Sequence, residues 1–113
     1  MKFAVAVIKL VATLPKDRAC NHLASQLVRS GTAPALLYGE AQAAESRKDF
    51  VHKMRLALKE LRETSIGLRI LDEAGFIKSP EELGRLTTEN NELISIFSKS
   101  ISTAVKNINA GLI

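Results

Sequence analysis

A row of basic residues is the feature of this sequence best suited to contact a ligand. The row is spaced by seven residues and comprises Lys48, Arg55, Arg62 and Arg69. Seven residues are close to two helical turns, so on a helix these side chains would share one side over about 31 Å, with Lys59 beside them. Cations arranged in this way can follow a phosphate backbone with salt-dependent affinity. The row therefore makes RNA or DNA a candidate partner.

Ion pairs within the same helix offer an alternative explanation of this row. Glu63 lies four residues after Lys59, while Asp72 and Glu73 lie three and four residues after Arg69. Opposite charges at these distances meet on a helix surface. The row also lacks interleaved aromatic residues on which bases could stack. A solvated or subunit-facing charged surface remains the alternative.

Histidine and acidic residues give little support for a metal site. His22 and His52 are the two histidines, and Asp49 lies three residues before His52. A carboxylate-rich metal site in a bundle needs several inward-facing carboxylates and a Glu-x-x-His pair, which the sequence lacks. Asp49 and His52 also fall off the apolar side of their helix, so we expect them to face solvent or another subunit.

Nucleophilic catalysis is equally poorly supported. Cys20, Ser30 and Thr32 would each need a neighbouring base and an orienting acid. His22 is two residues from Cys20, a spacing that places the two side chains on different helix faces. The sequence contains neither GxxxxGK[ST] nor GxGxxG, the glycine patterns of phosphate-binding loops. We therefore expect no enzymatic activity and no bound cofactor.

The amino-acid composition limits the classes of protein to which this chain can belong. The 113 residues have 4% aromatic content, no tryptophan, a net charge of +4 and a pI near 9.5. This length predicts a single domain over residues 1–113 with an aliphatic core. The single cysteine cannot form an intrachain disulfide and fits a reducing cytoplasm. No apolar run approaches the roughly 20 residues of a membrane span, so we expect no membrane partner.

The longest predicted helix, residues 46–75, must organise the fold. Its apolar side is spaced by three and four residues and comprises Phe50, Met54, Ala57, Leu61, Leu68 and Leu71. Ser46 and Asp49 resemble a capping box, and Gly75 stands where a helix commonly ends. A helix of this length cannot bury its apolar side alone, so the other segments must pack along it.

The segments before it predict two helices. Pro15 ends the first, and Asp17 caps the second, which ends around Ala44. Gly31 and Pro34 disfavour a regular helix, so we expect a kink or a short break over residues 30–34. Small residues in that segment also allow two helices to approach closely.

A fourth helix follows the strongest local signal in the chain. Ser79 is a predicted N-cap, Pro80 suits the first turn, and Glu82 completes a capping box. Asn90 falls on the apolar side of this helix, where a polar residue more often fixes register than binds a ligand. With short connections between helices, the predicted fold is an all-α, antiparallel up-down four-helix bundle.

Three apolar residues of the longest helix fall outside its main apolar side: Leu56, Ile66 and Ile70. Some of them can reach a second neighbouring helix of the bundle. Those that stay exposed are candidates for a subunit interface.

Residues 29–71 resemble a known family. The shared features follow one another in order, from Arg29-Ser30-Gly31-Thr32 and Glu40-Ala41 through Asp49-Phe50-Val51-His52-Lys53-Met54 and Ala57-Leu58-Lys59-Glu60 to Glu63-Thr64 and Leu68. This pattern is similar to that of the bacterial four-helix-bundle proteins, also called 23S rRNA intervening-sequence proteins. Residues 33–39 depart from it, because relatives tend to carry an Asn and an acidic residue there.

The resemblance implies a small cytosolic bundle that forms homopentamers and carries no catalytic residue set. A related group of bundles assists retroelement reverse transcriptases as basic pentamers that touch nucleic acid. We therefore expect a non-catalytic homo-oligomer that serves as a scaffold or interaction module. The alternative is a nucleic-acid-binding accessory protein that uses the basic row, with a protein partner such as a reverse transcriptase.

Overall fold

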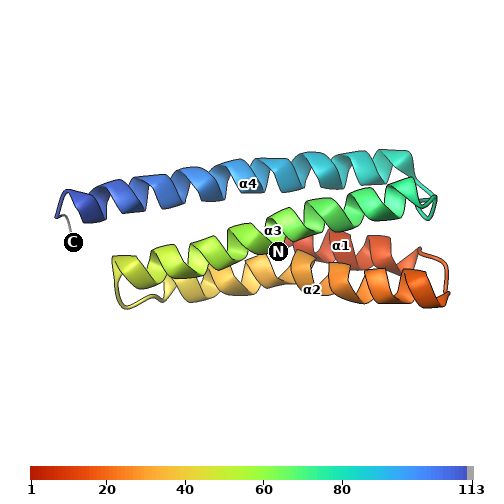
Figure 1. Ribbon diagram of the computed structural model, residues 1–113, viewed down its shortest axis with the longest axis horizontal. Helices are drawn as coiled ribbons and strands as arrows, with labels where there is room; N and C mark the ends of the chain where they lie inside the picture. The colour runs from red at the N-terminus through yellow and green to blue at the C-terminus, as the bar shows by residue number, and fades with distance from the viewer. Residues whose placement is uncertain (112–113) are drawn as a thin grey trace.

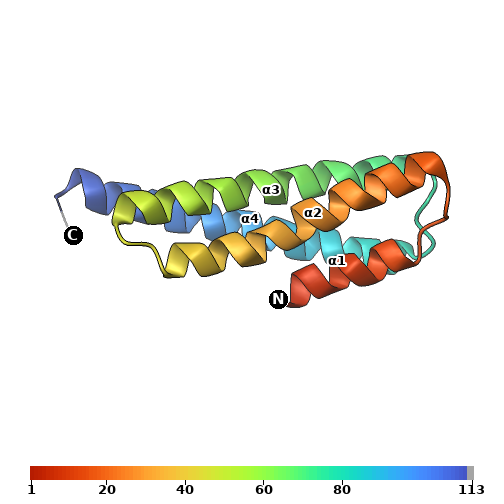
Figure 2. The same cartoon turned by 90° about the horizontal axis from the view of Figure 1, so that it is seen from below.

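The computed structural model describes residues 1–111 and consists of four helices (Figure 1). Their bounds are Lys2–Ala12 for α1, Arg18–Gln42 for α2, Arg47–Glu73 for α3 and Pro80–Asn109 for α4. Successive helices run in opposite directions along a molecule that measures 52 × 20 × 20 Å (Figures 1 and 2). The predicted all-α four-helix bundle is confirmed for these residues, and the last two residues of the predicted domain lie outside them.

Side-chain caps begin three of the helices where the sequence predicts them. Asp17, Ser46 and Ser79 each accept a hydrogen bond from the backbone N–H three residues later, at 2.8, 3.0 and 3.2 Å. Each bond satisfies one of the N–H groups that have no partner within a first helical turn. These local signals therefore set the starts of α2, α3 and α4.

The end of α3 is also set locally. Gly75 has a φ of +79°, in the left-handed region that glycine adopts without a Cβ penalty. The Phe76 N–H donates to the Leu71 carbonyl at 3.0 Å, and the Gly75 N–H donates to the Asp72 carbonyl at 3.0 Å. This is the Schellman arrangement that ends a helix and turns the chain toward α4.

The helices surround a core that is complete over only part of the bundle. α2 packs against α1 and α3, and α4 packs against α3 and α1. α1 has 11 residues, whereas α2, α3 and α4 have 25, 27 and 30, so α1 covers only part of their length (Figure 2). Beyond α1, the rings of Tyr38 and Phe97 bridge α2 and α4 with centroids 5.7 Å apart. The cavity beside them, about 280 Å³, is bordered by Met1 and Phe3 of the α1 end.

The predicted apolar side of α3 is buried. Its five C-terminal members, Met54, Ala57, Leu61, Leu68 and Leu71, are 2% exposed or less. Phe50 is half-buried and packs against the core. Two polar residues that the apolar pattern does not include, Glu60 and Thr64, are buried beside them.

Of the kink or short break expected over residues 30–34, the break is wrong. α2 runs without interruption from Arg18 to Gln42 with Pro34 inside it. Pro34 lacks the N–H that would donate to the Ser30 carbonyl, but Ser30, Gly31 and Pro34 are all buried against neighbouring helices. Tertiary packing therefore outweighs the helix-breaking tendency of this segment.

Candidate functional site

The five basic residues predicted as a nucleic-acid-binding row are exposed along α3: Lys48, Arg55, Lys59, Arg62 and Arg69. Ion pairs divide this row into two groups. Lys59 Nζ lies 4.0 Å from Glu63 Oε1, and Arg69 Nε lies 3.8 Å from Glu73 Oε1. By contrast, Lys48, Arg55 and Arg62 form no ion pair with any residue between 1 and 111. The predicted ion pairs are thus present at Lys59 and Arg69, whereas Lys48, Arg55 and Arg62 remain unpaired within the described residues.

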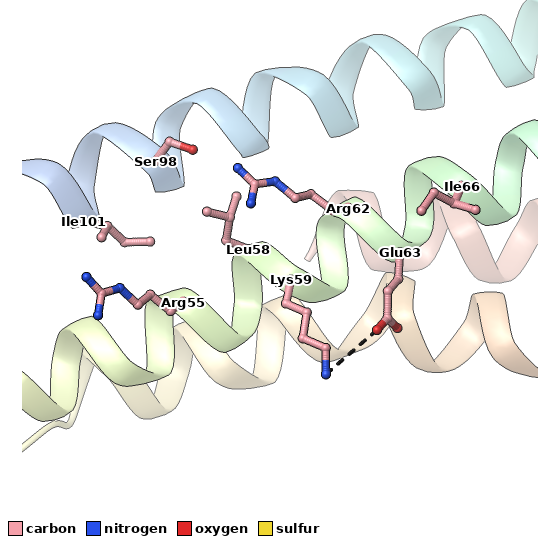
Figure 3. A pocket seen from close by; sticks show the side chains of 8 residues that line it. All are labelled: Arg55, Leu58, Lys59, Arg62, Glu63, Ile66, Ser98 and Ile101. Carbon is pink, nitrogen blue, oxygen red and sulfur yellow. Dashed lines mark ion pairs between the residues drawn. The ribbon is translucent and has the colours of Figure 1, made fainter.

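Two of the unpaired cations flank a groove between α3 and α4 (Figure 3). The groove has a volume of about 500 Å³, and α4 contributes Ser98 and Ile101 to its lining. The guanidinium groups of Arg55 and Arg62 lie on the α4 side, with Leu58 between them, whereas Lys59 points away toward Glu63. The groove therefore combines cationic edges with an apolar floor.

An arginine of α2 binds the carboxylates on the other side of α3. Arg29 Nη1 lies 2.7 and 2.8 Å from the two carboxylate oxygens of Glu60, and Arg29 Nη2 lies 2.8 Å from Glu63 Oε2. The hydrogen bond from Arg29 holds the pKa of the Glu63 carboxyl below its usual value. The same two carboxylates, Glu63 foremost, raise the pKa of Arg29. This cluster joins α2 to α3 and pairs Glu63, which also lines the groove, with Arg29.

The residues after Arg29 also serve helix packing. Thr64 Oγ1 donates to Ser30 Oγ at 3.0 Å across the buried α2–α3 contact. A Cβ on Gly31 would lie only 2.7 Å from a methyl carbon of Val7, so α1 crosses α2 closely at this point. The predicted close approach of two helices is confirmed at Gly31.

Asn90 of α4 is buried as its position on the apolar side predicts, at 1% exposure. Its Nδ2 donates to the Leu61 carbonyl at 3.0 Å and to Ser65 Oγ at 2.6 Å. Its Oδ1 is buried and has no hydrogen-bond partner among the described residues. These bonds fix how α4 is aligned along α3, the register role expected for a polar core residue.

The three apolar residues predicted for a subunit interface differ in exposure. Ile66 is 60% exposed and Ile70 is 42% exposed, one turn apart on α3. Leu56 is half-buried. Ile66 lines the α3/α4 groove and also, with Ile70, a second groove between α2 and α3. These two isoleucines form an exposed apolar ridge, and Leu56 contributes less to it.

The remaining reactive side chains are scattered. His22 and His52 are exposed on different helices, and Cys20 is fully buried. Burial, together with the nearby Asp17 carboxylate, raises the pKa of the Cys20 thiol, which favours the unreactive protonated form. Within residues 1–111, no three His, Cys, Asp or Glu side chains cluster closely enough to hold a metal ion.

Sequence reasoning missed Glu60, Thr64 and the partner of Arg29. Thr64 continues the three-and-four spacing of the buried residues of α3, so that spacing could have revealed it. The contact of Arg29 with Glu60 joins residues 31 positions apart, so no local sequence pattern could have revealed it.

None of the described helices has the length and apolarity to span a bilayer.

Comparisons with known proteins agree with this fold. The family model described as 23S rRNA-intervening sequence protein matches residues 1–99. A crystal structure from the S23 ribosomal protein family of Bacteroides thetaiotaomicron VPI-5482, a protein with unknown function, is also similar. It shares 30% sequence identity and a TM-score of 0.81, covering 88% of this chain and 92% of that chain. The curated proteins give no match. The chain therefore belongs to the 23S rRNA-intervening sequence protein family.

Proposed function

We propose that the protein is a non-catalytic, cytoplasmic homo-oligomer, pentameric as its family resemblance implies, that serves as a scaffold or interaction module. The observation that supports self-association is the exposed ridge of Ile66 and Ile70 on α3. Fully burying an isoleucine side chain contributes about 1.5–3 kcal/mol. A second copy of the chain packed on this ridge would gain the part of that stabilisation that corresponds to the 60% of Ile66 and 42% of Ile70 still exposed.

Replacing both ridge residues tests this proposal. The double variant Ile66→Lys, Ile70→Lys should lower the mass of the assembly, because two cations would have to be buried in the contact. Both side chains are substantially exposed in the single subunit, so helix content should remain unchanged. Light scattering after size separation measures the mass, and circular dichroism measures the helix content.

The control is Ile8→Lys, because Ile8 is 50% exposed on α1, away from the ridge. This variant should keep the wild-type mass. A monomeric wild-type protein, or a double variant with unchanged mass, would contradict the assignment of the ridge.

We propose nucleic-acid binding as a second candidate function, alone or beside a protein partner such as a reverse transcriptase. It is supported by Lys48, Arg55 and Arg62, which are exposed and have no carboxylate partner within residues 1–111. Cations that are not already paired can release counterions from phosphates at little electrostatic cost. Arg69, paired with Glu73, should contribute less.

The salt dependence of RNA or DNA binding tests this candidate. Arg55→Gln and Arg62→Gln should each weaken binding and reduce the slope of log K against log salt by about one. Arg69→Gln is the matched control and should change the slope by less. Fluorescence anisotropy at several salt concentrations gives the slopes. A wild-type protein that fails to bind either nucleic acid at low salt would reject the candidate.

A further inference from the structure

We infer that the subunits associate head to tail, so that the ridge of Ile66 and Ile70 in one copy packs into the cavity between α2 and α4 of the next copy. The inference rests on the proposed self-association and names the surface that receives the ridge. The two surfaces belong to different helices of each subunit, because the ridge lies on α3 whereas α1, α2 and α4 line the cavity.

The cavity lies where α1 begins. α2 and α4 each pack against α1 and α3 rather than against each other, so α1 fills the space between them. At the start of α1 that space becomes a cavity of about 280 Å³ beside the Tyr38 and Phe97 rings. Phe97 is buried, whereas Tyr38 and Ile96 are 45% and 60% exposed. The cavity therefore has an exposed rim that an incoming side chain can reach.

The lining of the cavity suits an aliphatic side chain. None of the described side chains that line it is charged, and the Tyr38 hydroxyl is their one polar group apart from backbone. Three large exposed apolar residues gather there: Met1, Tyr38 and Ile96. Exposed apolar residues gathered in one place are typical of an interaction site. An isoleucine from a second copy would lose contact with water in this cavity and be stabilised there.

The charges beside the two surfaces are complementary. Arg62 lies four residues before Ile66, and both line the α3/α4 groove. Glu92 lies four residues before Ile96, and both line a groove on the surface of α4. Arg62 and Glu92 are exposed, and neither forms an ion pair with a residue between 1 and 111. Because the charge is one turn from the isoleucine on both helices, Ile66 can enter the cavity while Arg62 meets Glu92 of the next copy.

This ion pair would orient the subunits more than it would hold them together. Exposed ion pairs contribute little to stability, but opposite charges favour one relative orientation of two surfaces. The apolar ridge would supply the affinity. Arg62 would then face a neighbouring subunit, and Lys48 and Arg55 would remain available to a nucleic acid.

A head-to-tail contact covers more of the exposed apolar surface than a two-fold contact does. In a two-fold contact the same surface meets itself, so ridge would pack on ridge and the cavity would stay open. In a head-to-tail contact both surfaces of each subunit are covered. Such contacts build a ring when the rotation between subunits closes, whereas one two-fold contact ends at a dimer. The head-to-tail contact is therefore the one compatible with the proposed pentamer.

The test mixes two variants that each lack one surface. The double variant Ile66→Lys, Ile70→Lys removes the ridge, and Ala35→Trp fills the cavity, because half-buried Ala35 lines it. Each variant alone should have a lower mass than the wild type. In an equal mixture they should form a dimer that contains one of each, because the ridge of the cavity variant can still enter the cavity of the ridge variant. Light scattering after size separation measures the masses.

Ala19→Trp is the matched control and should keep the wild-type mass, since Ala19 is exposed at the other end of α2. If Ala35→Trp loses helix content by circular dichroism, Ile96→Lys takes its place, because Ile96 is exposed at the rim. A monomeric wild type would reject self-association itself. If the wild type self-associates, a cavity variant with the wild-type mass, or a mixture without the dimer, would overturn the head-to-tail contact.

Discussion

Gly31 sets the distance between α1 and α2. The gap at this residue is filled by Val7, whose two methyl carbons would lie 2.7 and 2.9 Å from an added Cβ. Val7 is fully buried, so its side chain has little room to turn away. The close contact thus depends on one glycine, at a position where helix propensity alone would favour alanine.

Gly31→Ala should therefore lower the free energy of unfolding. Overpacking of a core commonly costs about 1–3 kcal/mol, which exceeds the helix-propensity gain of about 1 kcal/mol. Gly39→Ala in the same helix is the matched control, because no atom lies within 4 Å of its added Cβ. It should raise stability by about 0.4–1 kcal/mol. Urea unfolding measures both, and equal stabilisation by the two variants would disprove the packing role of Gly31.

At the scale of helices, the Arg29 cluster couples α2 to α3 in a way that depends on pH. The pKa of Glu63 in the folded protein lies below its ordinary value of 4.5. As the pH falls through that value, Glu63 becomes protonated in the unfolded chain but stays ionised in the folded protein. The stabilisation from this group is therefore present above pH 4.5 and is lost as the pH falls toward the lowered pKa.

Glu63→Gln should remove this part of the acid sensitivity. The variant should be less stable than the wild type near neutral pH, and the difference should shrink as the solution is acidified. The effect should be modest, because the Glu63 side chain is 37% exposed and water screens the pair. Urea midpoints across the acid range give the comparison. Glu92→Gln, which removes a carboxylate without a described ion pair, should show no such convergence.

The helix boundaries could be predicted because the signals that set them are local. Asp17, Ser46 and Ser79 cap their helices with bonds to the backbone three residues away, and Gly75 ends α3 by its own backbone conformation. Pro34 does not interrupt α2, because its effect depends on distant packing. Its local cost to the helix is offset by burial that no neighbouring residue reveals.

The candidate site was predictable only in part. The spacing of Lys48, Arg55 and Arg62 revealed the row, and the i,i+4 spacing also predicted that Lys59 pairs with Glu63 and Arg69 with Glu73. By contrast, the contacts of Arg29 with Glu60 and Glu63 depend on the packing of α2 against α3. Charge spacing along one helix is readable from sequence, whereas the meeting of two helices is not.

For the whole molecule, charge is distributed unevenly along the bundle. Asp72, Glu73, Glu81 and Glu82 flank the connection between α3 and α4, where Arg69, Lys78 and Arg85 also lie. The unpaired cations of the α3 row, Lys48, Arg55 and Arg62, extend from Arg62 toward the other end of α3. Because the opposite charges around the connection partly cancel, the attraction for a polyanion is weaker there than along the unpaired cations.

The short first helix makes local stability differ between the two ends of the bundle. Beyond the start of α1, the core is formed by three helices instead of four, and the partly exposed Tyr38 and Ile96 border the cavity at this transition. Segments with less buried apolar contact open at lower free energy than the rest of a domain. The later part of α2 and the last turns of α4 should thus fluctuate open while the α1-covered end stays folded. The end of the bundle covered by α1 would then be more stable than the end formed by three helices. A partner whose binding requires a local conformational change would bind more readily at the three-helix end.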